Sequence, residues 1–217
     1  MKRLLIATLL GSSLLISSNT AAQQQTIPPT LLQRIRQLLG LVQPVAAGGS
    51  RGSSKQLCLI SPQVASLQQV AITPTATPTI RVIQPLNEVR IEKDGKPLWR
   101  RVASSSNAIE GLIAWPLQPL QPGEQLELVL RPRGASGGDA ARISLQAASA
   151  DVLAKTNVLL KSVENNPMAW EAAMDDALQT NNQALAMVLL NARSSASSAS
   201  DVSLEELIQA SSCQTKP

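Results

Sequence analysis

Apolar and polar residues alternate along the middle of the chain with a period of two, which is typical of half-buried β-strands. Short turn segments separate these stretches, and the Asp94-Gly95 dipeptide between two of them is a strong signal for a tight hairpin. The pattern in residues 55–148 therefore predicts about seven short strands in an antiparallel, immunoglobulin-like β-sandwich. The strands are expected at residues 56–61, 80–83, 89–93, 97–102, 109–115, 126–131 and 143–145.

A turn rich in proline and glycine precedes the strand expected at residues 126–131. Residues 117–128 resemble the leucine–proline–glycine corner that comes before a late strand in immunoglobulin-like and fibronectin-type sandwiches. In those sandwiches a tyrosine usually follows the glycine by three residues, whereas Leu126 follows Gly123 here. The turn therefore indicates the class of fold and leaves its strand order open.

From residue 149 onward the apolar positions recur with the period of an α-helix. Residues 149–193 are expected to form an α-helical hairpin extension that packs on the sandwich, which makes the protein mainly β but α+β overall. One helix should begin after Asn166, because asparagine caps helix N-termini and Pro167 suits the first helical position. Residues 194–217 are expected to contain a flexible linker and a short helix capped by Ser203 and Glu206.

The first residues have the organisation of a secretory signal peptide. Lys2 and Arg3 precede an apolar segment at residues 4–16, and a polar segment with a small-residue cleavage site follows. We expect residues 1–22 to be removed on export, with a retained N-terminal anchor as the alternative. The remaining chain has no other segment apolar enough to span a membrane, so the expected location is periplasmic or secreted.

Residues 23–54 combine an amphipathic segment with a glycine- and serine-rich linker. Apolar residues from Leu31 to Val42 have helical spacing, and Arg34 and Arg36 lie on the opposite side of the predicted helix. Such a helix either packs on the domain or rests on an anionic membrane surface. The following Gly-rich segment lacks the Gly-Lys pair of a phosphate-binding loop, so we interpret it as a linker.

Composition excludes several kinds of catalytic and metal site. The chain has no histidine, phenylalanine or tyrosine, and its aromatic residues are Trp99, Trp115 and Trp170. Without histidine there is no Ser-His-Asp triad and no histidine-based zinc site, and two cysteines are too few for a structural metal site. We expect no cofactor, no metal and no enzymatic activity. A Ser-dependent hydrolase acting on an envelope substrate is the alternative, although neither Ser-x-x-Lys nor Lys-Thr-Gly occurs.

The expected compartment bears on whether the two cysteines, Cys58 and Cys213, form a disulfide. Disulfides persist in oxidising environments outside the cytoplasm. A bridge between these residues would join the start of the folded region to its tail, and a buried free thiol at Cys58 is the alternative. We expect the bridge.

Charge is distributed unevenly between the two parts of the chain. Residues 23–146 have a net charge of +6, and residues 147–217 have a net charge of −4. Either the two parts dock on each other, or the β part exposes a basic face to another protein or to an anionic polysaccharide or lipid of the envelope. Nucleic acid is disfavoured by the compartment and the missing aromatic residues. The candidate basic face comprises Arg81, Arg90, Lys96, Arg100, Arg101, Arg131 and Arg133, in which Arg100 and Arg101 should point to opposite sides of one strand.

The order of these features also suggests a family. A signal peptide, the Gly-Gly-Ser-Arg-Gly linker, the Cys-Leu-Ile strand at Cys58, the Asp94-Gly95-Lys96 turn, the proline–glycine corner and a helical pair follow one another. This order resembles a secreted cyanobacterial family of unknown function that joins a β-sandwich to a helical tail. The resemblance implies an envelope location and supplies no site residues. Together these observations predict a non-catalytic, exported cell-envelope protein that binds through its basic β part.

Overall fold

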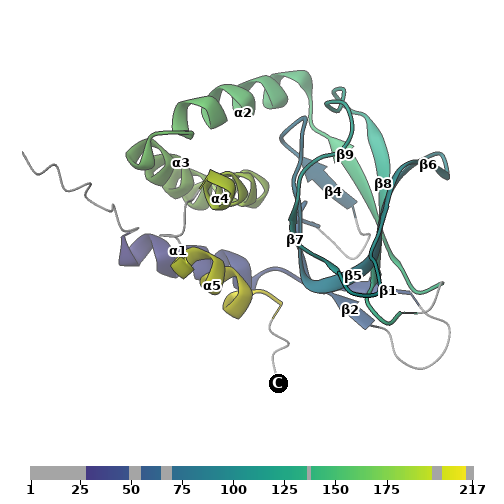
Figure 1. The fold of residues 1–217 in the computed structure, drawn as a ribbon. Coiled ribbons are helices and arrows are strands. Elements are labelled where there is room, and N and C mark those ends of the chain that lie inside the picture. The colour runs from purple at the N-terminus through teal and green to yellow at the C-terminus, as the bar shows by residue number, and fades with distance from the viewer. Residues whose placement is uncertain (1–27, 49–54, 65–69, 136–137, 197–201, 214–217) are drawn as a thin grey trace, which may run out of the picture.

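A curled β-sheet and a group of helices lie side by side in this protein (Figure 1). A computed structural model of the chain describes residues 28–48, 55–64, 70–135, 138–196 and 202–213. The strands are β1 (Val45–Ala47), β2 (Lys55–Leu57), β3 (Leu59–Ser61), β4 (Val70–Thr73), β5 (Ile80–Lys93), β6 (Lys96–Val102), β7 (Ile109–Ile113), β8 (Gln125–Pro132) and β9 (Ala141–Ala147). The helices are α1 (Pro29–Gly40), α2 (Ala150–Val163), α3 (Pro167–Gln179), α4 (Gln183–Ala196) and α5 (Val202–Ser211).

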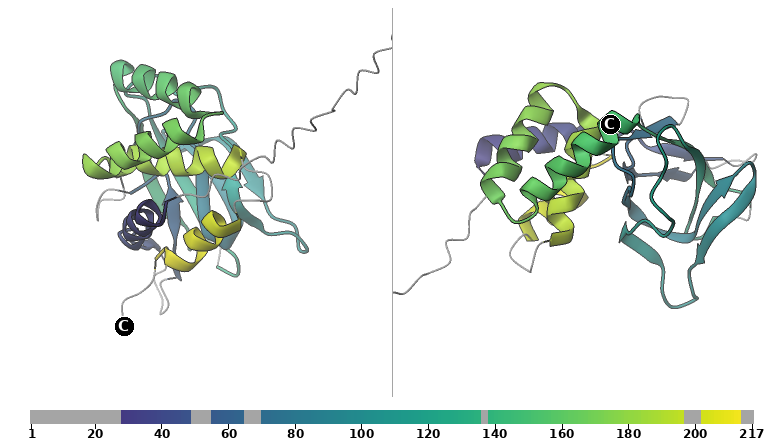
Figure 2. Two further views of the ribbon diagram at one scale, coloured as in Figure 1. Left: turned by 90° about the vertical axis from the view of Figure 1, so that its left-hand side faces the viewer. Right: turned by 90° about the horizontal axis from the view of Figure 1, so that it is seen from above.

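Strand β5 organises the larger sheet, which contains seven strands in the described part of the chain. Its first half pairs with β3 and β7, and its second half pairs with β6 and β8. The sheet continues from β8 to β9 and ends at β4, which runs parallel to β9. The other pairs are antiparallel, so the sheet is mixed, and it curls into a half-barrel beside the helices (Figure 2). Strands β1 and β2 form a separate two-stranded sheet.

The expected antiparallel, immunoglobulin-like sandwich is not confirmed, whereas the mainly β, α+β composition is. One curled sheet encloses its own apolar face, and Glu88, Arg90 and Glu92 line the outer side of β5 between buried apolar residues. A second sheet would have little apolar surface to cover on that outer side. Strand β4 is not predicted by the sequence pattern, and its parallel pairing with β9 is the feature that makes the sheet mixed.

Two turns predicted from glycine have the expected backbone. Asp94 and Gly95 have φ angles of +52° and +74°, which is the left-handed backbone of a two-residue hairpin turn between β5 and β6. Gly123 has a φ of +73°, and its N–H donates a hydrogen bond of 3.2 Å to the carbonyl oxygen of Ala147. The corner before β8 is therefore held to the end of β9 by backbone hydrogen bonding, without the missing tyrosine.

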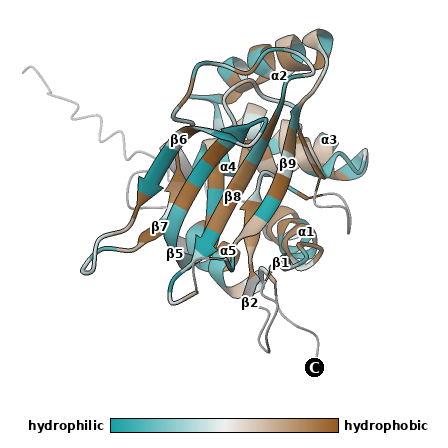
Figure 3. Cartoon of the chain, turned by 90° about the vertical axis from the view of Figure 1, so that its right-hand side faces the viewer, coloured by the Kyte–Doolittle hydropathy of each residue, from teal (hydrophilic) through white to brown (hydrophobic). Residues whose placement is uncertain are grey.

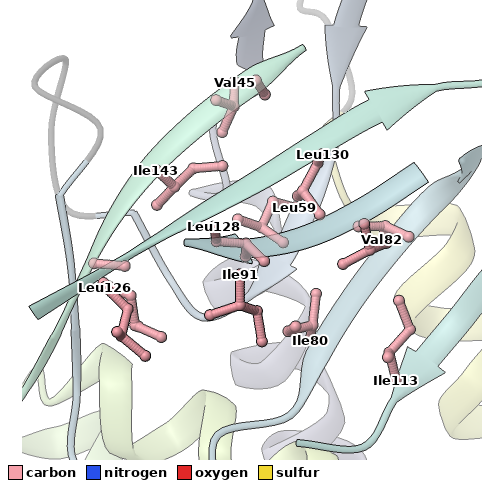
Figure 4. Close-up of a cluster of buried hydrophobic side chains, with 14 of the residues drawn as sticks. Val45, Leu59, Ile80, Val82, Ile91, Ile113, Leu126, Leu128, Leu130 and Ile143 are labelled. Atoms are coloured by element: carbon pink, nitrogen blue, oxygen red, sulfur yellow. The ribbon is translucent and has the colours of Figure 1, made fainter. Parts of the chain in front are cut away.

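The apolar residues form two clusters that meet at β3. The first fills the curled sheet, where Leu126, Leu128 and Ile143 face Ile80 and Ile91 (Figure 4). The second lies among α1, α3, α4 and α5 and contains the fully buried Trp170. The continuous apolar run that ends at β3 serves both clusters because successive side chains of a strand point to opposite faces. Leu57 and Leu59 belong to the sheet cluster, and Cys58 and Ile60 belong to the helical cluster.

The helices agree with the sequence signals at several positions. Helix α1 buries Leu31, Ile35, Leu38 and Leu39 in the helical cluster, which confirms the packing alternative for this amphipathic segment. The side chain of Asn166 accepts a hydrogen bond from the N–H of Ala169, as expected of an N-cap. Helix α5 begins at Val202, one residue before the predicted start.

The expected signal peptide at residues 1–22 and most of the Gly/Ser linker lie outside the described residues. Among the described residues, no helix combines the length and apolar character required to cross a membrane.

The expected disulfide between Cys58 and Cys213 is present and joins the residue between β2 and β3 to the residues that follow α5, with a Cα–Cα distance of 5.7 Å. The free-thiol alternative at Cys58 is therefore not confirmed. The bridge closes a loop of 155 positions and fixes the end of the described chain to the strand that both clusters share.

Candidate interaction surface at the edge of the sheet

The seven basic residues predicted to form one face do not lie on one face. Arg81 is buried, with 4 % of its surface exposed, at the boundary between the sheet and the helices. Its guanidinium donates hydrogen bonds to Asn191 Oδ1, at 3.2 Å, and to Glu205 Oε2 of α5. Burial lowers the pKa of Arg81, and the charge of Glu205 acts in the opposite direction. Arg81 therefore couples the basic and acidic parts of the chain and is removed from the candidate surface.

A second ion pair also joins these two parts: Arg34 of α1 pairs with Asp175 of α3. One of the two explanations for the charge asymmetry is that the acidic helices dock on the basic part of the chain. This docking explains the ion pairs of Arg34 and Arg81. The remaining predicted residues lie on the sheet itself.

On the outer side of the sheet, arginine and glutamate residues form a network across four strands. Residues that face each other across adjacent strands share one face of a sheet. Arg100 of β6 pairs in register with Arg90 of β5, and Val129 of β8 lies between Arg90 and Arg142 of β9. A row of three arginines therefore crosses this face, where polar and apolar positions alternate along β5, β8 and β9 (Figure 3).

Two buried glutamates neutralise much of this arginine row. Glu88 is 7 % exposed, and its carboxylate lies 2.6 Å from Arg100 Nε, 2.9 Å from Arg131 Nη2 and 3.6 Å from Arg90 Nη1. Glu92 is 5 % exposed, and its carboxylate lies 3.0 Å from Arg90 and 3.3 Å from Arg142. The network further includes an ion pair between Arg142 and Glu127. Arg90 and Arg131 therefore act mainly as partners of buried carboxylates.

The pKa of Glu88 reflects the positive charges that surround its carboxylate. Burial acts to raise the pKa of the carboxyl group. The hydrogen bond from Arg100 and the positive charges of Arg100, Arg131 and Arg90 act against burial and keep the pKa below its ordinary value. Glu88 is therefore ionised at neutral pH and stabilises the three arginines around it.

We expect Glu88→Gln to lower the free energy of unfolding at neutral pH by about 2 kcal/mol. The loss should be smaller than for a fully enclosed ion pair, because Arg100 is 55 % exposed and can be hydrated. Chemical denaturation followed by circular dichroism measures the change. Glu110→Gln, at an exposed position of β7, is the matched control and should change stability by less than about 0.5 kcal/mol.

The same variant has a predicted pH dependence. The folded-state pKa of Glu88 lies below its unfolded value of about 4.3, so its contribution is fully present above that unfolded value. The contribution decreases as the pH falls through the folded-state pKa. The stabilities of the natural protein and of Glu88→Gln should therefore converge in acid, and a constant difference down to low pH would contradict this role.

Four of the predicted cations lie at the surface: three on β6 and one directly after β8. We name these residues, Lys96, Arg100, Arg101 and Arg133, the cationic rim. All four are exposed. Lys96 and Arg101 have no carboxylate partner among the described residues. Arg100 pairs with Glu88 at 2.6 Å, and Arg133 donates a 2.8 Å hydrogen bond to the carbonyl oxygen of Ser105. Strand β6 itself contains no acidic residue. Within the cationic rim, Lys96 and Arg101 are thus the predicted cations whose charge no carboxylate of the described residues neutralises.

Sequence reasoning found the cations and missed the two glutamates that neutralise several of them. Glu88, Arg90 and Glu92 have i, i+2 spacing on one strand, which places them on one face. That spacing could have indicated that acidic and basic side chains pair with one another on this face, in place of a uniformly basic face. The expectation that Arg100 and Arg101 point to opposite sides agrees with the register, because they pair with Arg90 on the outer face and with buried Val89 on the inner face.

Away from the sheet edge, the described residues also form a hollow among the helices. An open hollow of about 130 Å³ between α1 and α3 is lined mainly by Arg34, Gln37, Leu41, Asn181 and Gln183. Its charged residue, Arg34, is already paired with Asp175. In the described part of the chain, no three acidic or cysteine side chains are grouped so that they could hold a metal ion.

Comparisons with protein-family models, with curated proteins and with solved structures find no match for this chain.

Proposed function

We propose that the protein is a non-catalytic, exported cell-envelope protein that binds another protein or an anionic envelope component at the cationic rim. The observation that carries the proposal is the composition of β6, an exposed strand with Lys96, Arg100 and Arg101 and no carboxylate. Positive charge concentrated at an exposed edge attracts anionic partners and accelerates their association. The export signal in the sequence supports the location, and the Cys58–Cys213 disulfide is compatible with an oxidising compartment.

Binding assays on the chain without residues 1–22 test this proposal. Beads carrying polyglutamate, an anionic polysaccharide or anionic lipid vesicles should retain the protein at low salt and release it at high salt, because screening weakens exposed charge interactions. The variant Lys96→Gln/Arg101→Gln should lose most of this retention. Arg36→Gln/Lys161→Gln removes the same charge from exposed positions of α1 and α2 and should bind normally.

Loss of retention by both double variants to the same extent would show that net charge alone is responsible. Absence of retention on every anionic surface at low salt would overturn the proposal. Specific labelling of a single serine by a fluorophosphonate probe would instead support the hydrolase alternative.

A further inference from the structure

Strand β6 has an unused edge. Within the described residues it pairs with β5 alone, and it lies at the side of the sheet turned away from the helices (Figure 1). The backbone N–H and C=O groups on the other side of such a strand can pair with an additional strand. Leu98 and Val102 on this strand are about half exposed, at 49 % and 53 %. An extended segment of a partner would find both backbone hydrogen-bonding groups and apolar surface here.

We propose that β6 binds an extended acidic segment of another protein by strand addition. The inference rests on the proposed function and specifies its partner and its mode of recognition. The segment should carry two adjacent carboxylates between two apolar residues, a pattern that follows from the side chains of β6.

The register of β6 defines what each position of an added strand would meet. Trp99 pairs with Ile91 and packs against the sheet cluster, and Arg101 pairs with Val89 on that same inner side. Arg100 and Val102 lie on the outer side opposite Arg90 and Glu88. Directly opposed residues of neighbouring strands share a face and interact. Successive residues of an added strand would therefore face Trp99, Arg100, Arg101 and Val102 in turn.

Adjacent cations on opposite faces select for adjacent carboxylates. A residue opposite Arg100 lies on the outer face, where the guanidinium bonds Glu88 through Nε and is still 55 % exposed. Its neighbour opposite Arg101 lies on the inner face, so two consecutive Asp or Glu residues would each meet one arginine. Apolar residues are favoured at the flanking positions opposite Trp99 and Val102. The order apolar–acidic–acidic–apolar is the same read in either direction, so it fits both a parallel and an antiparallel partner strand. Pro97 lacks an N–H and would limit the added ladder to about residues 98–102.

The charges also disfavour the simplest competing occupant, a second copy of β6. Pairing two β6 strands would place arginines opposite or beside arginines, and like charges at opposed positions are destabilising. The sequence has two pairs of adjacent carboxylates, Asp175-Asp176 and Glu205-Glu206, and both lie inside helices. The acidic strand must therefore come from a different protein.

Synthetic peptides test strand addition separately from charge attraction. The probe is an eight-residue capped peptide, Thr-Thr-Val-Glu-Glu-Val-Thr-Thr, and a permuted peptide with the core Glu-Val-Val-Glu has the same composition and charge. The permuted peptide should bind at least about tenfold more weakly, because its carboxylates face Trp99 and Val102. Lys96→Gln/Arg101→Gln should weaken binding of the first peptide, whereas Arg36→Gln/Lys161→Gln should not.

Backbone pairing is tested by methylating alternate amides of the first peptide. Alternate residues of a strand direct their N–H groups toward one side, so only one of the two methylation patterns should abolish binding. Amide hydrogen exchange in residues 98–102 should slow when the unmodified peptide binds. Retention of binding by both methylated peptides, or its loss in both, would overturn strand addition.

The two proposals fail differently. If the rim retains polyglutamate but methylation pattern and residue order have no effect, strand addition is wrong and charge-based binding at the rim stands. If the peptides do not bind and none of the three anionic surfaces retains the protein at low salt, both proposals are wrong.

Discussion

Replacing both cysteines by alanine, Cys58→Ala with Cys213→Ala, should lower the free energy of unfolding by up to about 5 kcal/mol. The bridge spans 155 positions, and a loop of this length removes much of the conformational entropy of the unfolded chain. It also holds the segment after α5 against Cys58, which directly precedes β3 and is 1 % exposed in the helical cluster.

Guanidinium denaturation followed by circular dichroism measures this effect. The natural protein in the presence of a reductant should match the double variant, and the double variant should not respond to the reductant. A difference below about 1 kcal/mol would show that packing of α5 alone holds the tail in place.

Trp170→Ala should lower the free energy of unfolding by about 3–5 kcal/mol. Trp170 is 2 % exposed at the centre of the helical cluster, and its Nε1–H donates a 2.8 Å hydrogen bond to the carbonyl oxygen of Leu189 in α4. The guanidinium carbon of Arg193 lies 5.6 Å from the ring centroid, in a cation–π arrangement. Alanine would leave a large cavity and remove this hydrogen bond between α3 and α4.

Two further variants separate packing from hydrogen bonding at Trp170. Trp170→Phe keeps most of the apolar volume but cannot donate to Leu189, so it should cost about 1–2 kcal/mol. Trp115→Ala removes a partly buried tryptophan from the sheet cluster and should cost less than Trp170→Ala. Equal losses for Trp115→Ala and Trp170→Ala would contradict the central role of Trp170.

Local signals in the sequence predicted local structure well. The Asp94-Gly95 hairpin, the Asn166 cap and the amphipathic helix at α1 each depend on a few neighbouring residues, and all three are confirmed. The disulfide could be predicted because two cysteines allow a single intramolecular pairing.

Long-range pairing could not be predicted in the same way. The sequence indicated two strands, at residues 80–83 and 89–93, because Pro85 interrupts the alternation, whereas the structure has one long strand, β5. Register shifts next to Leu86 accommodate the proline, and the Pro85 carbonyl oxygen accepts a 2.8 Å hydrogen bond from the Arg133 N–H. The parallel pairing of β4 with β9 joins segments about seventy residues apart, and no local pattern encodes it.

The partners of charged residues also depend on long-range pairing, so the candidate surface could be predicted only in part. Counting residues identified an excess of cations in the β part but could not show which of them face a carboxylate in the folded sheet. Arg81 is expected on the exposed face but is buried, because folding brings Asn191 of α4 and Glu205 of α5 against its guanidinium. Lys96 and Arg101 remain accessible because β6 is at an edge.

The contact between α1 and α5 has a consequence for the order in which the protein can be completed during synthesis. These helices lie near opposite ends of the described chain, yet they pack together in one apolar cluster with α3 and α4. Every strand of the curled sheet precedes α2 in the chain, so its cluster can assemble while the last residues are still being made. The helical cluster must wait for α5. Until then part of the apolar side of α1 stays uncovered, so the two clusters can be completed only in the order sheet first, helices second.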